Sequence, residues 1–578
     1  MKTHLFILLL ITVLSGCATN SIQQTSLKTV TALPENHGVV AVQVINNTSR
    51  LAPLHKGWTE VIAVRLDNRE ARKQAAIEKA KIKKPNINPD DVEWEPDFYS
   101  LSLDSQGVVE SQLFSGSMPQ GKYIISLLYS YYFDGDISSW VSMPVSWSAG
   151  TFDVKANQFT NLGSVVFQPL LNVKEKSFWS SGSSQKAYVT RLNELEDLQK
   201  FVIDLYPQAT KAVDFSNPLT WEEDELDELR NDLSALSREN AFGDNAMSLS
   251  QIGTGAVAAK FGQLRVLKSN GTWQQINLPT NAQISAVHEI NNKVIVGAER
   301  GLVYFADSLN GSWEKLTPVS ATQAIIWFGK GNGEYFALTS SAKDYFVYTF
   351  DSINQPWTKI GTFKKKNPND WLVQNGGLFP IIKRNGEIRI LNDNKLFDFS
   401  SQTRQWTNTK ASSMVKLSQL KNGVLLGLEV SQWDGIGDQV ISFDEGNSWN
   451  TISRRLDIFG DNKADRSLPA MLDNGTVVTI GRVGDKGKRK LKLITQTKEN
   501  ISDRKSWQAH GEAKKDCHSP LPELTHNNRL YFLCDQGQIV STDDFGINWT
   551  TEVEIDIPSM QQQYDALLEA LKTMEPTE

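Results

Sequence analysis

Alternating apolar and polar residues dominate the chain from residue 38 to about residue 170. The segments 39–46 (VVAVQVIN), 59–66 (TEVIAVRL) and 122–133 (KYIISLLYSYYF) have the period of strands that bury one face. Similar segments recur up to residues 162–168 (LGSVVFQ). The pattern predicts a β domain over residues 38–172, and we expect a β-sandwich.

A helical period replaces the alternation between residues 185 and 243. The sequence Thr220-Trp221-Glu222-Glu223 has the composition of a capping box and predicts a helix start. One apolar stripe follows it, formed by Leu226, Leu229, Leu233 and Leu236. We therefore expect a short helical connector over residues 173–245.

Two further segments favour helices. The basic insertion 69–84 predicts a solvated helix, and a contact surface for anionic lipid or lipopolysaccharide is the less favoured alternative. Residues 555–578 predict a C-terminal helix that docks on the rest of the protein through one apolar face.

From residue 246 onward the pattern repeats. Pairs such as Asn332-Gly333 and Asn474-Gly475 separate apolar runs and favour two-residue hairpins. A tryptophan is expected to open the fourth strand of each repeat, at positions 273, 313, 357, 406, 449, 507 and 549. Seven units of four strands at this period predict a seven-bladed β-propeller over residues 246–554. The fold class is therefore mainly β: a β-sandwich, a helical connector and a propeller.

The N-terminus has the pattern of a secretion signal. Lys2 precedes an apolar run over residues 5–14, which is too short to span a membrane. The following Leu14-Ser15-Gly16-Cys17 resembles the bacterial lipobox. The resemblance implies a signal peptide over 1–16, a diacylglycerol thioether and palmitate on Cys17, and a flexible tether over 17–37. Ala18, where an aspartate would signal retention, implies the outer membrane, with the protein facing the periplasm or the cell surface.

Composition narrows the class of partner. A net charge of −7 over 578 residues does not suggest a nucleic-acid binder, and we expect no cofactor. Cys517 and Cys534 are the cysteines that remain after Cys17, and a disulfide between them is favoured in an oxidising envelope. A metal site is the competing interpretation, because three histidines lie nearby, but the spacing matches no familiar zinc pattern: His510, His518 and His526.

Two segments resemble the Asp-box, a turn motif of bacterial sialidases and of many non-enzymes. They are Ser442-x-Asp444-x-Gly446-x-Ser448-Trp449 and Thr542-x-Asp544-x-Gly546-x-Asn548-Trp549. The aspartate can accept backbone N–H groups, glycine permits a positive φ, and tryptophan buries its ring. We therefore expect both aspartates to organise turns rather than to catalyse a reaction.

The β domain carries a second resemblance. Met118-Pro119-Gln120-Gly121-Lys122-Tyr123, followed by Phe152-Asp153-Val154 and Asn161-Leu162-Gly163, is similar to transthyretin-like or carboxypeptidase-regulatory-like β-sandwiches of envelope proteins. The Pro-x-Gly turn combines a fixed φ with a residue that tolerates a positive φ.

The sialidase resemblance also implies a catalytic site, which the sequence does not provide. That family needs an arginine triad, a Tyr-Glu nucleophile pair and an acid/base aspartate, and its Arg-Ile-Pro signature is absent here. Arginines of the propeller lack the family contexts: Arg265, Arg300, Arg384 and Arg482. We assign no catalytic residue and predict a non-catalytic binding or assembly module. The alternatives are a glycan-active enzyme and a purely structural spacer.

Cationic and aromatic residues gather in loops of the later repeats. Such loops predict a recognition surface for an acidic envelope protein or an anionic polysaccharide, with solvated loops as the simpler alternative. The predicted surface comprises Lys364, Lys365, Lys366, Trp371, Trp433, Asp434, Arg454, Arg455, Phe459, Lys488 and Arg489.

Overall fold

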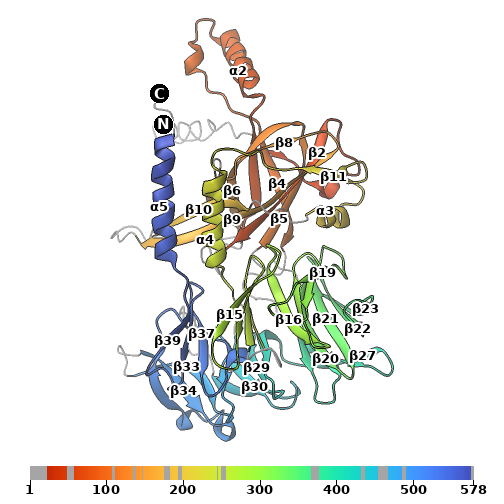
Figure 1. Ribbon diagram of the computed structural model, residues 1–578, viewed down its shortest axis with the longest axis vertical. Coiled ribbons are helices and arrows are strands. Elements are labelled where there is room, and N and C mark those ends of the chain that lie inside the picture. Colours follow the sequence, from red (N-terminus) through yellow and green to blue (C-terminus); the bar gives the residue numbers. More distant parts are fainter. Residues whose placement is uncertain are drawn as a thin grey trace, which may run out of the picture.

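The protein consists of an N-terminal β domain stacked on a ring of seven sheets (Figure 1). The computed structural model describes residues 22–47, 57–106, 111–133, 138–145, 148–174, 183–192, 198–243, 245–248, 255–365, 377–430, 437–453, 467–484 and 490–574. Within these ranges, no helix is long and apolar enough to cross a membrane.

The N-terminal domain is one sheet of eleven strands, in the order β10-β9-β2-β5-β4-β3-β6-β7, with β1, β8 and β11 pairing β4, β6 and β9. Inward-facing side chains from most strands meet in one core, which includes Val42, Val61, Phe114 and Val165. The strands are β1 (Gln23–Gln24), β2 (His37–Asn46), β3 (Glu60–Arg65), β4 (Phe98–Gln106), β5 (Ser111–Pro119), β6 (Gly121–Phe133), β7 (Ser138–Pro144), β8 (Thr151–Val154), β9 (Gln158–Lys174), β10 (Ser183–Leu192) and β11 (Asp214–Leu219).

This sheet includes residues that we expected outside it. Residues 23–37 lie in the fold and not in a tether: β1 pairs β4, Thr25 Oγ1 donates to Ser100 O at 2.7 Å, and Leu27 is buried in the short helix η1 (Leu27–Thr29). The expected connector also contributes β10 and β11 to the sheet. Apolar burial explains the first difference, because Leu27 joins a cluster with Phe159 and Phe201.

The helices of the connector are α3 (Gln199–Leu205) and α4 (Asp227–Glu239). The predicted capping box does not start α4: Glu222 instead pairs with Lys122 at 2.6 Å, and Trp221 packs against Phe152. Buried Arg230 binds Asp224 and Asp227, each at 2.6 Å, near the true helix start. Asp227 also pairs with Arg191 of β10, which ties the start of α4 to the sheet.

The insertion forms an arm that projects from the end of the N-terminal domain farthest from the ring (Figure 1). It contains α2 (Arg69–Lys83) and the short helix η2 (Pro89–Asp91). Ile77 is the buried residue of α2, so the prediction of a solvated helix is confirmed.

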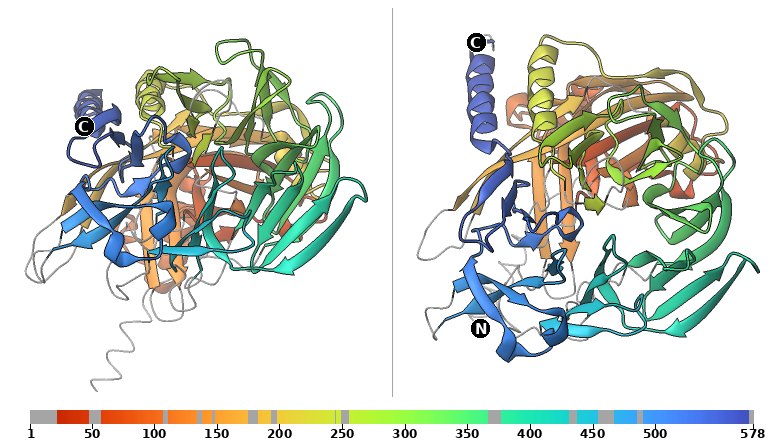
Figure 2. Two further views of the ribbon diagram at one scale, coloured as in Figure 1. Left: turned by 90° about the horizontal axis from the view of Figure 1, so that it is seen from below. Right: turned by 60° about the horizontal axis from the view of Figure 1, so that its bottom comes forward.

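The ring is a seven-bladed propeller of four-stranded sheets (Figure 2), as the repeats predicted. First strands of neighbouring blades contact one another, which places them innermost. The blades are β12 (Asn245–Ser248), β13 (Gly255–Ala258), β14 (Gln263–Leu267), β15 (Trp273–Asn277); β16 (Ile284–Ile290), β17 (Lys293–Ala298), β18 (Val303–Ala306), β19 (Glu314–Leu316); β20 (Ala324–Gly331), β21 (Glu334–Ser340), β22 (Asp344–Phe350), β23 (Thr358–Lys364); β24 (Leu378–Ile382), β25 (Ile388–Asn392), β26 (Lys395–Ser400), β27 (Gln405–Lys410); β28 (Met414–Gln419), β29 (Leu425–Glu429), β30 (Gln439–Ser442), β31 (Asn450–Ser453); β32 (Ala470–Met471), β33 (Val477–Val483), β34 (Lys490–Gln496), β35 (Gln508–Glu512); and β36 (Ser519–Pro520), β37 (Leu530–Leu533), β38 (Ile539–Thr542), β39 (Thr550–Val553).

The ring closes without sharing strands between its first and last blades, since every blade is built from four consecutive strands. Side chains close the seam instead. Val257 and Leu267 of blade 1 pack with Leu521 and Leu524 of blade 7. Trp273 Nε1 also donates to Glu552 Oε2 at 3.1 Å.

A disulfide in the core between blades 6 and 7, and a C-terminal helix, stabilise the end of the chain. Cys517 and Cys534 are bonded in blade 7, and the loop between them contains the short helix η7 (Pro522–Leu524). The C-terminal helix α5 (Ile557–Met574) returns to the N-terminal domain and lies beside α4 (Figure 2). Met560 is fully buried there with Leu170 and Tyr188. The N-terminal domain thus contacts both blade 1 and the helix that follows blade 7.

Candidate functional site

The two faces of the propeller carry different connections. Turns between first and second strands, and between third and fourth strands, lie on one face because adjacent strands are antiparallel. The opposite face, which we call the loop face, carries the turns between second and third strands and the connections between blades. The N-terminal sheet docks on the loop face: Ala259 and Phe261, between β13 and β14, pack on Ile45, Val166 and Leu192.

The two Asp-box-like turns lie on the other face, between β30 and β31 and between β38 and β39. Asp444 Oδ1 accepts the N–H of Ser448 at 2.9 Å, and Oδ2 accepts its hydroxyl at 2.6 Å. Gly446 has a φ of 87° and donates its N–H to Ser442 Oγ at 2.9 Å. Both carboxylate oxygens of Asp444 therefore accept hydrogen bonds from within their own turn.

The second turn repeats this geometry. Asp544 Oδ1 accepts the N–H of Asn548 at 2.9 Å, and Gly546, with a φ of 85°, donates to Thr542 Oγ1 at 2.8 Å. Trp549 is half-buried and donates Nε1 to Glu512 O at 3.1 Å. Trp449 is likewise half-buried against blades 4 and 5.

Hydrogen bonds keep both carboxylates ionised. Burial opposes ionisation of Asp444, but the bonds from Ser448 and Ser442 outweigh it and lower the pKa of that carboxyl. The backbone N–H of Asn548 lowers the pKa of Asp544. A general acid needs the opposite shift, so both residues have the electrostatics of turn organisers.

Most residues of the predicted recognition surface lie outside the described part of the chain. These are Lys366, Trp371, Trp433, Asp434, Arg454, Arg455, Phe459, Lys488 and Arg489, and Cys17 also lies outside it.

Lys364 and Lys365 are described, at the end of β23 on the loop face. Lys364 Nζ pairs with Asp344 Oδ1 at 2.8 Å. Lys365 Nζ lies 4.8 Å from the ring centre of Tyr345, and burial lowers the pKa of Lys365 to about 8. Both lysines thus contact blade 3 itself.

Polar contacts hold α3 and β2 to blade 2. Asp204 Oδ2 accepts Ala321 N–H at 2.8 Å and Ser320 Oγ–H at 2.9 Å. Glu299 Oε1 accepts Gln43 Nε2–H at 2.6 Å. Burial opposes ionisation of Asp204, but hydrogen bonds from Lys200, Ala321 and Ser320 lower its pKa. This junction therefore depends on charged groups.

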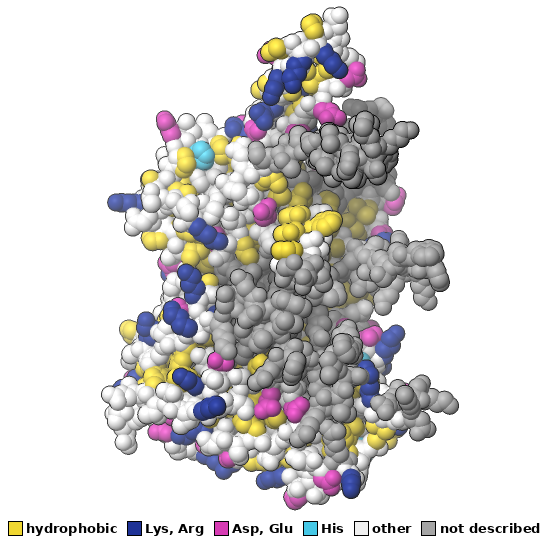
Figure 3. Space-filling view, turned by 180° about the vertical axis from the view of Figure 1, so that it is seen from behind, with side chains coloured by type: hydrophobic (Ala, Val, Ile, Leu, Met, Phe, Trp, Pro, Cys, Tyr) yellow, Lys and Arg dark blue, Asp and Glu magenta, His cyan; other side chains and the backbone are white. Residues whose placement is uncertain are grey.

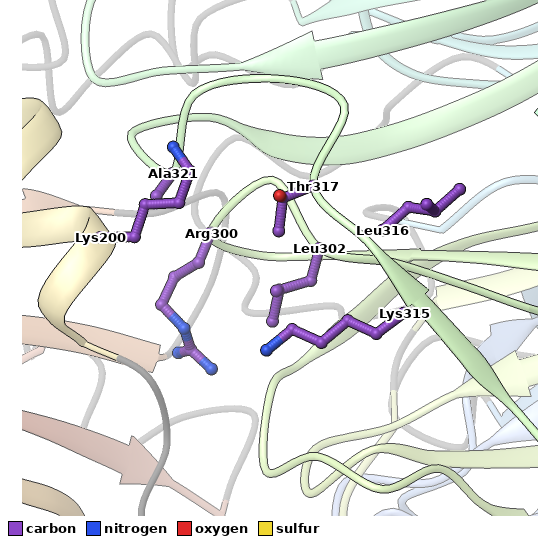
Figure 4. Close-up of a pocket in the computed structure, with 7 residues that line it drawn as sticks. All are labelled: Lys200, Arg300, Leu302, Lys315, Leu316, Thr317 and Ala321. Atoms are coloured by element: carbon purple, nitrogen blue, oxygen red, sulfur yellow. The ribbon is translucent and has the colours of Figure 1, made fainter. Parts of the chain in front are cut away.

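A cavity of about 290 Å³ opens beside these contacts, between α3 and blade 2 (Figure 4). In this view Arg300 and Lys315 point into the same space below Leu302, whereas Lys200 turns toward Ala321. We call this cavity the junction pocket. It is lined by Lys200, Arg300, Leu302, Lys315, Leu316, Thr317 and Ala321.

The three cations of the junction pocket are held differently. Lys200 Nζ pairs with Asp204 at 2.8 Å, and the guanidinium of Arg300, only 4% exposed, pairs with Glu299 Oε1 at 3.0 Å. Lys315 is exposed on β19 and forms no ion pair within the described residues. A guanidinium beside an ammonium suits a carboxylate or another anion. No carboxylate or imidazole is among the seven lining residues.

The arginines that a sialidase triad would need have separate surroundings. Arg265 on β14 donates to Ala241 O at 2.9 Å, and burial lowers its pKa to about 10. Arg300 lies in the turn between β17 and β18. Arg384 lies in the turn between β24 and β25, on the other face, and donates to Phe443 O at 3.0 Å. These three guanidiniums do not converge on one site.

The centre of the ring is occupied by η7. This helix contacts β12 of blade 1 and β28 of blade 5, so it lies between first strands of distant blades. Leu524 is fully buried there, and burial raises the pKa of Glu523. Among the described residues, no group of three or more metal-binding side chains occurs.

Sequence reasoning missed the junction pocket. Lys200 and Lys315 lie 115 positions apart, and no local pattern links them. One signal was present in the sequence, the glycine of Arg300-Gly301, which favours a tight turn. In the structure both residues have positive φ values, 57° and 65°, at a loop-face position. Sequence reasoning also missed an exposed aromatic row on the β6–β7 hairpin, where Tyr131 lies opposite Trp140.

The fold and the junction pocket define a two-domain protein with a seven-bladed propeller. No protein-family model and no curated protein matches the chain. It is similar to the solved structure of YCF48 bound to D1 peptide, at 13% identity and a TM-score of 0.33, over 49% of this chain and 86% of that chain. It is similar to YCF48 from Cyanidioschyzon merolae, at 10% identity and a TM-score of 0.35, over 49% of this chain and 90% of that chain. BamB from Moraxella catarrhalis is similar at 13% identity and a TM-score of 0.30, over 52% of this chain and 98% of that chain. At these values the similarity assigns neither a family nor an activity.

Proposed function

We propose that this chain is a lipoprotein of the bacterial outer membrane that acts as a non-catalytic binding or assembly module. Its junction pocket would hold an acidic segment of an envelope protein. The observation that carries the proposal is the convergence of Arg300 and Lys315 on a cavity of about 290 Å³. The exposed ammonium of Lys315, beside the guanidinium of Arg300, would attract a carboxylate on a partner.

Two observations favour binding over catalysis. The aspartates of the most distinctive motif, Asp444 and Asp544, are engaged in their own turns. The arginines 265, 300 and 384 have separate partners, which does not favour a sialidase-like triad. The glycan-active alternative therefore has no specific observation behind it.

Photo-crosslinking in intact cells tests the binding role. A photoreactive amino acid replaces Thr317, an exposed residue that lines the junction pocket. The matched control carries it at Ile547, which is 70% exposed in the second Asp-box-like turn on the other face. We expect one dominant protein adduct from position 317 and none from position 547. A glycan adduct would revive the carbohydrate alternative, and equal labelling from both positions would contradict a specific site.

The lipid anchor has a separate test. Metabolic labelling with an alkyne-bearing palmitate should label the wild-type chain, and Cys17→Ser should abolish the label. Undiminished labelling of the variant would overturn the anchor and leave the pocket proposal in place.

A further inference from the structure

The tip of the α2 arm carries positive charge that the described residues leave uncompensated. Residues 69–84 contain seven cationic side chains and two carboxylates, Glu70 and Glu78. Near the root, Arg72 pairs with Asp97 at 3.1 Å, and Arg69 lies 5.7 Å from the ring centre of Trp94. At the tip, four lysines are exposed and form no ion pair within the described chain: Lys79, Lys81, Lys83 and Lys84.

The arm also exposes an apolar residue among these lysines. Ile82 is 84% exposed, the highest exposed fraction among the large apolar side chains that the structure describes. Figure 3 shows the arm at the top of the molecule, with Lys and Arg side chains gathered on it. An apolar tip flanked by lysines has the composition of a helix that lies on a membrane surface.

Strand register brings the start of the chain to the root of this arm. β1 runs parallel to β4, with Gln23 opposite Tyr99. The arm returns to the sheet immediately before β4, which begins at Phe98. Because the two strands run in the same direction, β1 begins at the end of the sheet where the arm returns.

The segment from Cys17 to Gln23 and the helix α2 have similar lengths. Cys17 lies six positions before Gln23, and an extended segment over six positions spans at most about 20 Å. The fifteen residues of α2 form a helix about 22 Å long. A lipid on Cys17 would therefore hold the bilayer within reach of the lysine tip.

We propose that the α2 arm binds the surface of an anionic phospholipid bilayer, through its four tip lysines and Ile82. This inference rests on the proposed lipid anchor for its geometry, but not for its chemistry. Each lysine close to an anionic surface adds attraction that salt screens. The return segment carries four exposed carboxylates, at Asp90, Asp91, Glu93 and Glu95, which an anionic surface repels. The binding therefore depends on the tip lysines and is expected to be salt-sensitive.

Vesicle flotation of the full chain tests this proposal. Vesicles of phosphatidylcholine alone are compared with vesicles that also contain phosphatidylglycerol, so any binding by the apolar leader is common to both. We expect at least tenfold tighter binding to the anionic vesicles at low salt, and loss of that gain at high salt.

The arm variant neutralises the four lysines as Lys79→Gln, Lys81→Gln, Lys83→Gln and Lys84→Gln, which keeps good helix formers. A matched propeller variant makes the same change at exposed Lys359, Lys395, Lys410 and Lys505. The gain on anionic vesicles should fall at least tenfold in the arm variant and persist in the propeller variant. Equal binding of wild type and arm variant would overturn the proposal, as would a wild type that ignores phosphatidylglycerol.

A Cys17→Ser chain separates this inference from the anchor. It should keep the phosphatidylglycerol-dependent gain, because the tip lysines are unchanged. Loss of the gain in that chain alone would show that the lipid and not the arm is responsible, and would overturn the inference while supporting the anchor.

Discussion

Blades 2 and 7 flank blade 1 on either side, and their contacts differ in kind. Blade 7 meets blade 1 through apolar side chains such as Leu521 and Leu524, and the disulfide of Cys517 and Cys534 packs on its other side, against blade 6. Blade 2 meets the N-terminal domain through ionised groups such as Asp204 and Glu299. Apolar contacts are insensitive to pH and moderate salt, whereas ionic contacts are not. The difference predicts that the seam is insensitive to pH and moderate salt and that the junction responds to both.

Removing the disulfide of blade 7 should have the largest effect. Replacing both cysteines of blade 7, as Cys517→Ala with Cys534→Ala, removes a cross-link across 17 positions. Such a loop contributes about 3 kcal/mol to the free energy of unfolding. Denaturant titration of the variant and of the reduced wild type should give the same loss. A loss below about 0.5 kcal/mol would contradict the role assigned to this disulfide.

The junction side should respond to pH. Asp104 accepts the Tyr206 hydroxyl at 2.5 Å and so holds the end of α3, and burial raises the pKa of Asp104 to about 6. Between about pH 4 and pH 6 the folded state keeps a proton that the unfolded state has released. The free energy of unfolding should therefore fall by about 2 kcal/mol as pH rises through this window.

The control for this pH effect is Asp104→Asn, which cannot ionise and can still accept the Tyr206 hydroxyl. Thermal unfolding followed from pH 4 to pH 6 should lose this component in the variant. An unchanged slope would show that another group is responsible.

The contact between α3 and blade 2 should show a slightly smaller effect. Asp204→Ala removes the acceptor for Ala321 N–H and Ser320 Oγ–H, at a cost of about 1.5 kcal/mol. Hydrogen exchange should show faster exchange in α3 and around residue 321, with blade 7 unchanged. Because the pKa of Asp204 is lowered in the folded state, the wild-type contact should weaken as pH falls below about 4. Faster exchange across all blades would contradict a local role.

The Asp-box-like turns should show the smallest change in stability. Asp444→Ala removes acceptors for the N–H and hydroxyl of Ser448 in an exposed turn, which should cost about 1 kcal/mol. The melting temperature should fall accordingly, while crosslinking from position 317 stays at its wild-type yield. A loss of crosslinking without a loss of stability would give this face the recognition role that we assign to the other.

The sequence predicted repetitive structure far better than contacts between domains. Trp273 opens the fourth strand of its blade, and Trp313, Trp449 and Trp549 directly precede theirs, because each repeat carries its own local turn and burial signals. Asn291-Asn292 likewise adopts the positive φ values that its composition favours, 51° and 64°. Local patterns of this kind do not depend on the rest of the chain.

What escaped prediction depends on distant partners. Leu27 is buried because Phe159 and Phe201 cover it, which a polar N-terminal stretch does not reveal. Glu222 does not cap a helix, because it pairs with Lys122 on β6 of the sheet. The junction pocket needs Lys200 from α3 and Lys315 from blade 2, so it exists only once the two domains are docked.

The most direct test of the account is crosslinking from position 317 in three backgrounds: wild type, Lys315→Glu and Lys359→Glu. Lys315 lies opposite Tyr304 in blade 2, and Lys359 occupies the equivalent place opposite Tyr348 in blade 3. Both lysines are exposed, so neither change should alter stability by more than about 0.5 kcal/mol. The account predicts that Lys315→Glu reduces the protein adduct several-fold, because it reverses the charge beside Arg300, and that Lys359→Glu leaves it unchanged. Equal yields in all three backgrounds would contradict a binding role for the junction pocket.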